Sequence, residues 1–374
     1  MDKKAIYIDA AASALKPESV IRAESDFLRN HYANSGRGVC ARADAVDKMT
    51  ADSRIAVAGL VGARPEQIVF TSGATDGLNR IPRILEASSA LAGKPLVLAS
   101  DLDHHSARLP WEALARLGKC RFQVAPLDKE YNIDAAAMRK ADVLVITAMS
   151  NVIGTPQNVK DITARARMLN PNVITIVDAA QHVAHLPIDV RDWDCDFLCF
   201  SGHKIGADTG IGVMYMKDPN RWHPDKFGGG MVSSVADNEW IFAPAPAKFE
   251  AGTLPLTQIC GLKEAIRELA TLRADALRVA CATHLRAELS KIPRIKFISP
   301  AGAHLLTFVI DGMHPLDFGA LMGAKGVCLR VGNMCASWLH RALGIPGSIR
   351  ISPGPWNTME EMEEVIKIVK EVIK

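Results

Sequence analysis

The sequence reads VITIVDAAQ at residues 173–181 and FLCFSGHK at residues 197–204. Each segment begins with a short apolar run, which is typical of a buried strand, and ends in polar residues. Ligands of open α/β sheets bind outside the carboxyl ends of the strands, so both segments bring their polar residues to one edge. The two segments therefore predict an α/β fold with a binding site that contains Asp178 and Lys204.

These two residues together indicate a pyridoxal phosphate (PLP) site. A lysine amine can form an imine with the cofactor aldehyde, and a carboxylate can keep the pyridine nitrogen protonated, so that the ring becomes an electron sink. A lysine in a glycine-containing turn is usually a solvated surface residue, so Lys204 alone would say little. Asp178 at the end of an apolar strand is the stronger sign, and the pair predicts PLP chemistry.

The segment TSGATDG at residues 71–77 is a candidate phosphate cradle. It follows an apolar run and precedes a helical pattern, so free backbone N–H groups and the helix dipole would face an anion there. Turns of this composition are common, and the assignment depends on the second anchor that Ser201 and His203 would supply.

The chain has 374 residues, of which 48% are hydrophobic, so it is long enough for two domains and is not expected to be disordered. A net charge of +3 gives no reason to expect a nucleic-acid partner. No apolar stretch approaches the ~20 residues needed to cross a bilayer. Residues 1–14 carry Asp9 inside their short apolar part, unlike a signal peptide, so we expect no membrane partner and a cytoplasmic location.

The eight cysteines form no CxxC pair and no spacing typical of zinc or iron–sulfur ligands, so we expect no metal site. Most of the thiols should be reduced and buried. Cys335 is the expected exception, because it lies in a glycine-containing loop between two apolar runs.

Apolar runs and amphipathic segments alternate through the first two-thirds of the chain, which predicts a parallel or mixed sheet covered on both faces. The expected strands are residues 5–8, 67–70, 96–98, 120–124, 143–147, 173–177, 197–200 and 213–216. The expected helices include residues 19–30, 41–61 and 162–169.

The last third predicts a smaller α+β domain. Its expected helices are a long one from near Leu262, one over residues 315–322, and a last helix that begins with a capping box of Thr358 and Glu361. Its expected strands are residues 295–298, 305–310, 327–331 and 349–351. We therefore expect a large domain over residues 15–260 and a small domain formed by residues 1–14 and 261–374.

Several motifs run in order through nearly the whole chain: YIDAAASA (7–14), TSGATDGLN (71–79), DHHSARLPW (103–111), SNVIGT (150–155), FEAGT (249–253) and RVGNMCA (330–336). With these motifs the sequence resembles the fold-type I PLP enzymes of the class V aminotransferase group. Within that group it is most similar to the cysteine desulfurases of the Suf type, a family that includes the selenocysteine lyases. The resemblance implies a large domain with a mostly parallel seven-stranded sheet, a small α+β domain and a homodimer.

The resemblance also implies roles for individual residues. Lys204 would hold PLP as an imine and then move protons between the substrate Cα and the cofactor, and His104 would stack on the ring. Arg350 would bind the substrate carboxylate through its guanidinium fork, with Arg330 and Asn151 close by. The other implied cofactor contacts are Asp178 with the pyridinium, Gln181 and Asn151 with the phenolic oxygen, Ala74, Thr75, Ser201 and His203 with the phosphate, and Thr253 with the phosphate of the neighbouring subunit.

Cys335 is the nucleophile that the resemblance implies. Its thiolate would attack the sulfur of L-cysteine and leave L-alanine and a Cys335 persulfide for a sulfur-acceptor protein, in iron–sulfur cluster assembly or a related pathway. A lone cysteine is more often a buried structural residue, but its place in the RVGNMCA loop favours catalysis. Two alternatives stay open: a selenocysteine lyase or cysteine C–S lyase that does not need Cys335, and a PLP-binding scaffold for a partner protein.

The sequence departs from the family pattern at two places. Asn333 and Met334 stand where the family usually carries two histidines before the cysteine. Gly36 and Cys40 replace another usual histidine pair, around Arg37. The loss of these imidazoles would change the pKa of the catalytic thiol or the docking of the sulfur acceptor.

Overall fold

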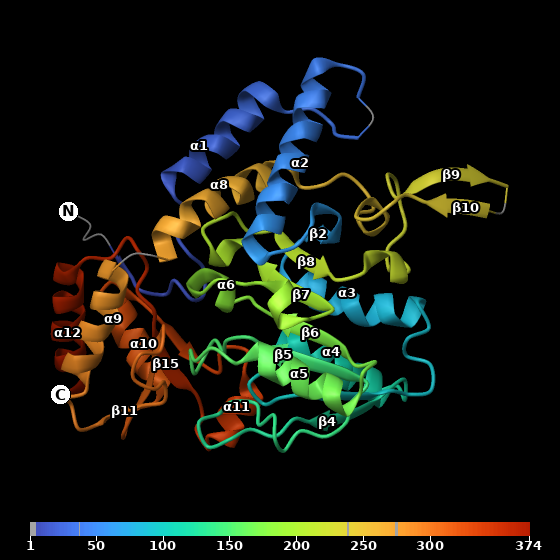
Figure 1. Ribbon diagram of the computed structural model, residues 1–374. Helices are drawn as coiled ribbons and strands as arrows, with labels where there is room; N and C mark the ends of the chain where they lie inside the picture. The colour runs from blue at the N-terminus through green and yellow to red at the C-terminus, as the bar shows by residue number, and fades with distance from the viewer. Residues whose placement is uncertain (1–4, 37, 238, 274–275) are drawn as a thin grey trace.

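The computed structural model describes residues 5–36, 38–237, 239–273 and 276–374, so residues 1–4 and Arg37 lie outside the described ranges. Figure 1 shows a central sheet between layers of helices, with the C-terminal third of the chain on one side and a projecting hairpin on the other. Within the described ranges, no helix combines the length and the apolar character needed to cross a membrane.

Seven strands form the main sheet, in the order β2-β8-β7-β6-β5-β3-β4. Strands β3 to β7 run parallel, and β8 is antiparallel to its neighbours β2 and β7. This order confirms the expected mostly parallel seven-stranded sheet. The strands are β2 (Ile68–Thr71), β3 (Leu96–Ala99), β4 (Arg121–Val124), β5 (Val143–Thr147), β6 (Ile174–Asp178), β7 (Phe197–Ser201) and β8 (Gly212–Met216).

Strand β7 shows why the central strands are apolar along their whole length. Phe197 and Cys199 pack into the core on one face, and Leu198 and Phe200 pack into the core on the other. All four side chains are fully buried, because helices cover both faces of the sheet. The first face is covered by α3 (Ala74–Ala87) and α4 (His105–Arg116), and the second by α2 (Ala41–Val61), α5 (Val159–Leu169) and α8 (Leu256–Arg273).

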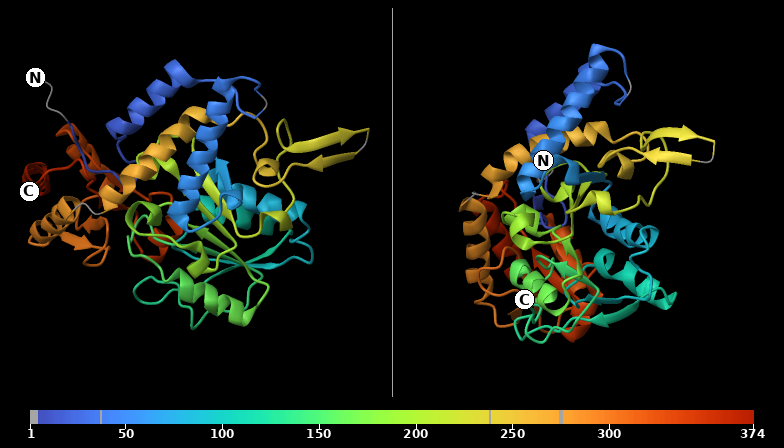
Figure 2. Two further views of the ribbon diagram at one scale, coloured as in Figure 1. Left: turned by 45° about the horizontal axis from the view of Figure 1, so that its top comes forward. Right: turned by 45° about the vertical axis from the view of Figure 1, so that its right-hand side comes forward.

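The other helices of this part are α1 (Glu18–Asp26), α6 (His182–His185) and α7 (Val190–Trp193), and α1 continues into a π-helical turn (Phe27–His31). Helices α1 and α2 both pack on α8, and Figure 2 shows them rising above the sheet. Helix α8 begins at Leu256, earlier than the expected start near Leu262. Ile259 and Leu262 belong to the core of the main sheet. We therefore propose that all of α8 belongs with the large domain, which places the boundary after Arg273 and later than the division expected at residue 260.

A second, antiparallel sheet of four strands lies in the C-terminal third, in the order β11-β12-β15-β14. The first strand of the chain, β1, pairs in parallel with β13, so the N-terminal segment joins this part of the molecule. The expected capping box of Thr358 and Glu361 is present at the start of the last helix. The elements are β1 (Ile6–Tyr7), α9 (Ala276–Leu289), β11 (Ile295–Phe297), β12 (Leu306–Ile310), α10 (Pro315–Ala324), β13 (Val327–Cys328), β14 (Arg330–Gly332), α11 (Ser337–Ala342), β15 (Ser348–Ile351) and α12 (Met359–Ile373).

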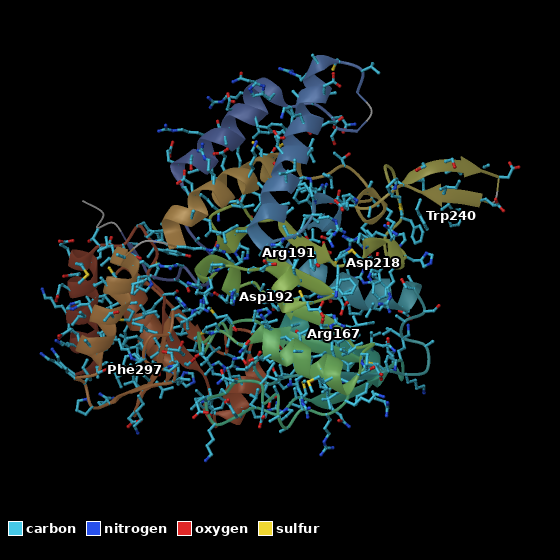
Figure 3. All side chains as sticks on the ribbon, in the orientation of Figure 1. Arg167, Arg191, Asp192, Asp218, Trp240 and Phe297 are labelled. Carbon is cyan, nitrogen blue, oxygen red and sulfur yellow. The ribbon has the colours of Figure 1, made fainter. Side chains whose placement is uncertain are left out.

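Strands β9 (Val232–Ala236) and β10 (Glu239–Phe242) form a hairpin that the sequence analysis did not predict. The hairpin projects from the body, and Figure 3 shows Trp240 on it. Val235, Trp240 and Ile241 are all exposed. Because neither face of the hairpin is buried in a core, its sequence lacks the clean alternation that marks a half-buried strand.

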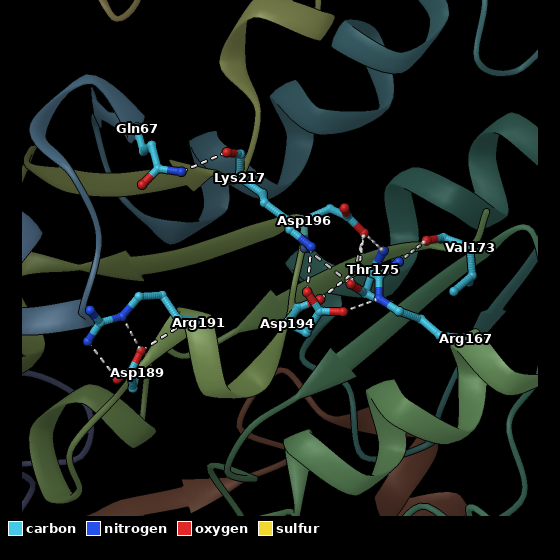
Figure 4. Close-up of polar contacts among 9 residues, drawn as sticks. All are labelled: Gln67, Arg167, Val173, Thr175, Asp189, Arg191, Asp194, Asp196 and Lys217. Atoms are coloured by element: carbon cyan, nitrogen blue, oxygen red, sulfur yellow. Dashed lines mark hydrogen bonds and ion pairs between the residues drawn. The ribbon is translucent and has the colours of Figure 1, made fainter. Parts of the chain in front are cut away.

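Polar contacts fix the edge of the main sheet opposite the pocket described below (Figure 4). Arg167 on α5 donates to the Asp194 carbonyl oxygen over 2.7 Å and pairs with the Asp196 carboxylate at 3.2 Å. Asp196, just before β7, accepts from the Thr175 backbone N–H on β6 over 2.8 Å. These bonds hold the amino ends of the neighbouring strands β6 and β7 together.

The cysteines are less buried than expected. Cys335 is exposed, as predicted, but Cys40 and Cys328 are exposed as well, so the expectation of a single exposed thiol was wrong. Cys40 precedes α2 in the segment that projects from the body, and Cys328 lies in the two-stranded pair with β1. The buried thiols are Cys120, Cys195, Cys199 and Cys281, and Cys260 is half-buried.

Candidate active site

The carboxyl ends of β6 and β7 and the turn after β2 meet around a pocket of about 190 Å³. This pocket joins most of the residues expected to bind a cofactor, namely Ala74, Thr75, His104, Asn151, Asp178, Gln181, Ser201, His203 and Lys204. Ser106, Thr147, Met149 and Ala180 complete the lining. Thr253, Arg330, Cys335 and Arg350 do not line it.

Lys204 lies in the short turn that follows β7. Its Nζ donates to the carbonyl oxygens of Ala11 and Ala12 over 2.6 and 3.0 Å. Burial, together with the positive charge of Arg350, lowers the pKa of Lys204 to about 8. A neutral amine is the nucleophilic form, so burial increases the fraction of Lys204 that can act as a nucleophile near neutral pH.

Asp178 ends β6, and its carboxylate is almost fully buried in the pocket wall. One oxygen accepts from the Ala180 backbone N–H over 2.9 Å. Burial raises the pKa of Asp178 to about 6, although the bond from Ala180 and the charge of Lys204 act in the opposite direction. A cationic N–H group bound beside this carboxylate would stabilise its charged form.

The turn before α3 is tied to the end of β7. The Ser201 hydroxyl accepts from the Ala74 backbone N–H over 2.7 Å. Gly212 allows the close approach of these segments, because a Cβ at this position would lie 2.4 Å from the Cα of Gly73. The first turn of α3 therefore opens on the pocket beside Ser201, which suits an anion such as a phosphate.

His104 caps the start of α4 and faces the same pocket. Its Nδ1 accepts from the Ser106 backbone N–H over 3.2 Å and lies 2.7 Å from the Ser106 hydroxyl. Burial, with the charge of Lys204, lowers the pKa of His104 to about 4, so its ring is neutral and can stack on a flat ligand. Burial likewise lowers the pKa of His203 to about 4.

Arg350 on β15 forms a buried ion pair with Asp9, 2.9 Å from Nη2 to Oδ1. The second carboxylate oxygen of Asp9 lies 2.9 Å from Nη2 of Arg330, so one carboxylate serves both candidate substrate arginines. Arg350 also donates to the Asn151 carbonyl oxygen over 2.9 Å. Asp9 had no role among the residues predicted from the sequence. The position of Asp9 inside an apolar run was the available signal, because a carboxylate that is buried there needs a partner.

The Cys335 loop lies between β14 and α11, and its thiol is exposed. The Asn151 side-chain amide donates to the Met334 carbonyl oxygen over 2.7 Å, so Asn151 joins the pocket wall to this loop. Gln181, which was expected to contact the cofactor, donates to the Ala11 carbonyl oxygen over 2.7 Å while lining the pocket.

Thr253 lies apart from the pocket. It lines a separate hollow of about 430 Å³ with Asn34, Gly229 and Glu250 among others, and its side chain is exposed. Within one chain, Thr253 is therefore not a ligand of the site that contains Lys204.

The sheet order and the lysine at its carboxyl edge define the fold of the type I PLP-dependent transferases. This chain belongs to the aminotransferase class-V family, whose sequence model matches residues 6–365. A cysteine desulfurase of Enterobacter sp. (strain 638) is 34% identical, over 98% of this chain and 93% of the relative.

Two solved structures are similar over 99% of this chain and 94% of their own. The apo structure of a cysteine desulfurase from Thermococcus onnurineus NA1 has a TM-score of 0.92 and 27% identity. The cysteine desulfurase CsdA from Escherichia coli has a TM-score of 0.90 and 30% identity. These matches confirm the family resemblance and the expected fold.

Proposed function

We propose that the protein is a PLP-dependent cysteine desulfurase that converts L-cysteine to L-alanine and stores the sulfur as a persulfide on Cys335. One observation supports the cofactor above all others. Lys204 and Asp178, a buried amine of lowered pKa and a buried carboxylate, line the same pocket. The names of the relatives support the choice of cysteine as substrate.

The residues present fit PLP in three respects. Lys204 offers an amine for the aldehyde, Asp178 offers a carboxylate for the pyridinium, and the first turn of α3 with Ser201 offers donors for the phosphate. When bound, the cofactor would withdraw electrons from the substrate Cα. His104 would cover one ring face, and Gln181 would lie near the ring edge, as both line the pocket.

Arg350 would bind the substrate carboxylate. Its Nε is buried with no hydrogen-bond partner in the described part of the chain, whereas Nη1 and Nη2 are already engaged. A buried N–H without a partner is costly unless a ligand supplies one. Arg330, which shares the Asp9 carboxylate with Arg350, would add positive charge near it, and Asn151 would keep Arg350 in place through its carbonyl oxygen.

Lys204 would take the proton from the substrate Cα and return a proton later, because its amine titrates near neutral pH. The Cys335 thiolate would then attack the substrate sulfur. In this step the Cβ–S bond of cysteine breaks and an S–S bond to Cys335 forms. The reaction consumes one cysteine and one Cys335 thiol, and it forms one alanine and one Cys335 persulfide.

We propose a homodimer as the working form, in which Thr253 reaches the phosphate of the other subunit. Thr253 lies outside its own pocket, in a hollow lined by exposed backbone at Gly229 and Gly252. The persulfide would pass to a sulfur-acceptor protein, because an exposed loop thiol can be reached from outside. Sedimentation of the purified protein tests the dimer, with a monomer as the contradicting result.

Two other functions make different predictions. A selenocysteine lyase or a cysteine C–S lyase would release its product without Cys335. A PLP-binding scaffold for a partner protein would bind the cofactor but would not turn over cysteine.

The substitution Cys335→Ser separates these functions. The variant should keep the bound cofactor and its first spectral change with cysteine, and it should lose persulfide formation. Cys40→Ser is the matched control, since Cys40 is also exposed and serine is a favourable residue at the start of a helix. Mass spectrometry should find the added sulfur on the peptide with Cys335. Alanine production by Cys335→Ser at the wild-type rate would refute the persulfide step.

A further inference from the structure

The loop that carries Cys335 is fastened to helix α4 by two reciprocal hydrogen bonds. The backbone N–H of His105, the first residue of α4, donates to the Cys335 carbonyl oxygen over 2.8 Å. In return, the backbone N–H of Ser337, the first residue of α11, donates to Nε2 of His105 over 3.3 Å. First-turn N–H groups have no partner within their own helix. Each segment therefore supplies the acceptor that the other helix lacks.

The imidazole of His105 is held by further contacts. The Ser337 hydroxyl lies 3.1 Å from the same Nε2, and the Trp338 ring meets the imidazole edge-on, with 5.1 Å between ring centroids. Trp338 in turn lies against the Arg108 guanidinium, also on α4, at 4.2 Å. Since Nε2 accepts from a backbone N–H, the ring proton is on Nδ1. Burial lowers the pKa of His105 and so favours this neutral form.

The fastened segment has a strained backbone. Met334 and Cys335 have φ values of 48° and 55°, the left-handed region that residues other than glycine seldom adopt. Both of their carbonyl oxygens accept hydrogen bonds from the body, from Asn151 and from His105 respectively. The left-handed conformation is unfavourable for these two residues, so we expect the loop to leave it when these bonds are lost.

We propose that His105 is the positioning residue of the Cys335 loop and holds the thiol where it can reach a substrate bound in the neighbouring pocket. The preceding residue, His104, lines that pocket, so the same turn of α4 fixes both the pocket wall and the loop. The role in catalysis rests on the proposed function. The fastening of the loop rests on the contacts alone.

Three substitutions separate the side chain from the backbone. His105→Ala removes the imidazole and keeps the N–H that binds Cys335. His105→Gln keeps an acceptor for the Ser337 N–H. His105→Pro removes both groups, and proline is well tolerated at the first position of a helix. His223→Ala serves as the control, because His223 is an exposed histidine outside the site.

Two readouts on the resting holoenzyme report the loop directly. They are the rate at which iodoacetamide alkylates Cys335, followed by mass spectrometry, and the hydrogen exchange of residues 333–338. Losing one hydrogen bond should speed alkylation by about three- to tenfold in His105→Ala. His105→Pro should increase the alkylation rate further than His105→Ala does. His105→Gln should be alkylated at close to the wild-type rate, and His223→Ala at the wild-type rate. The cofactor absorbance and the melting temperature of each variant establish that it is folded.

A third readout is the transfer of sulfur from cysteine to Cys335. It should slow by a similar factor in His105→Ala, while the first spectral change with cysteine keeps its wild-type rate. Unchanged alkylation and exchange in both His105→Ala and His105→Pro would overturn the proposal. Faster alkylation with an unchanged rate of sulfur transfer would also overturn it. Sulfur that never appears on Cys335 in the wild type would refute the proposed function, and alkylation and exchange would still test the fastening.

Discussion

Asp9 and Arg350 form an ion pair of 2.9 Å that joins the N-terminal segment to strand β15. The two residues are only 5% and 2% exposed, so the guanidinium is oriented before any substrate arrives. Asp9 holds Nη2 and the Asn151 carbonyl oxygen holds Nη1. Asp9 therefore fixes the side from which a carboxylate can approach Arg350.

The substitution Asp9→Asn should lower the free energy of unfolding by about 3 kcal/mol, because it leaves a buried guanidinium without its counter-ion. Most of the loss should come from Arg350, since the Arg330 side chain is 48% exposed and its pairing is screened by water. Denaturant unfolding measures the change. Glu18→Gln breaks an exposed pair with Arg22 and should leave stability unchanged. Wild-type stability of Asp9→Asn would contradict a strong buried pair.

The substitution Arg350→Ala should reduce kcat/KM for cysteine by about tenfold or more, because it removes a buried charge-assisted partner of the carboxylate. Arg330→Ala should have a smaller effect, since that side chain is half-exposed. Steady-state assays of alanine measure both variants. A loss in Arg350→Ala no larger than in Arg330→Ala would show that the carboxylate binds elsewhere.

The substitution Lys204→Ala should abolish the covalent link to PLP. Wild-type protein should show a cofactor absorbance band that borohydride removes, and peptide mapping should find the reduced cofactor on Lys204. The variant should lack the reducible link, because among the residues that line the pocket Lys204 alone carries an amine. A variant that forms such a link at another lysine and turns over cysteine would disprove the assignment.

The lowered pKa of Lys204 predicts how cofactor loading depends on pH. Its amine is charged below about pH 8 and neutral above it. The rate at which cofactor-free protein forms its imine with added PLP should rise about tenfold per pH unit below 8 and level off above 8. Stopped-flow absorbance measures this rate. A rate that still rises steeply at pH 10 would contradict the lowered pKa.

The same pKa shift affects stability. Between about pH 8 and the usual lysine value of 10.5, the unfolded chain binds a proton at Lys204 that the folded chain does not bind. Stability rises with pH wherever the unfolded state binds more protons. The contribution of Lys204 to the stability of the cofactor-free protein should therefore increase through this window, and Lys204→Met should lack this increase.

The central strands of the main sheet were predicted because they have a complete hydrophobic environment. Strands β5, β6 and β7 are covered on both faces and appear in the sequence as continuous apolar runs. Helix α2 was predicted with its observed bounds, residues 41–61. The hairpin β9–β10 was missed because it buries neither face. Helix α8 was placed too late, although Pro255 immediately before Leu256 was an available start signal.

Asp178, Ser201 and Lys204 were predicted because they follow strands, where position along the chain indicates position in space. His104, Asn151 and Gln181 were assigned through the family resemblance. Asp9 and His105 were missed because their roles depend on partners far away in sequence. His105 and Ser337 are 232 residues apart, and Asp9 and Arg350 are 341 apart. Contacts of this kind depend on how the two parts of the molecule pack, so a local pattern can indicate that Asp9 needs a partner but cannot identify Arg350 as that partner.

The ion pair between Asp9 and Arg350 joins segments near the two ends of the chain, so it can form only late in synthesis. All seven strands of the main sheet lie between Ile68 and Met216, so the ribosome releases them early. At a translation rate of ~5–20 residues per second, roughly 20 to 70 s pass between the synthesis of Asp9 and that of Arg350. A nascent chain that stalls after Met216 and before Arg350 contains Lys204 and all strands of the main sheet, but it lacks the proposed anchor for a carboxylate. The proposed carboxylate anchor is therefore completed last, after the pocket that would hold the cofactor.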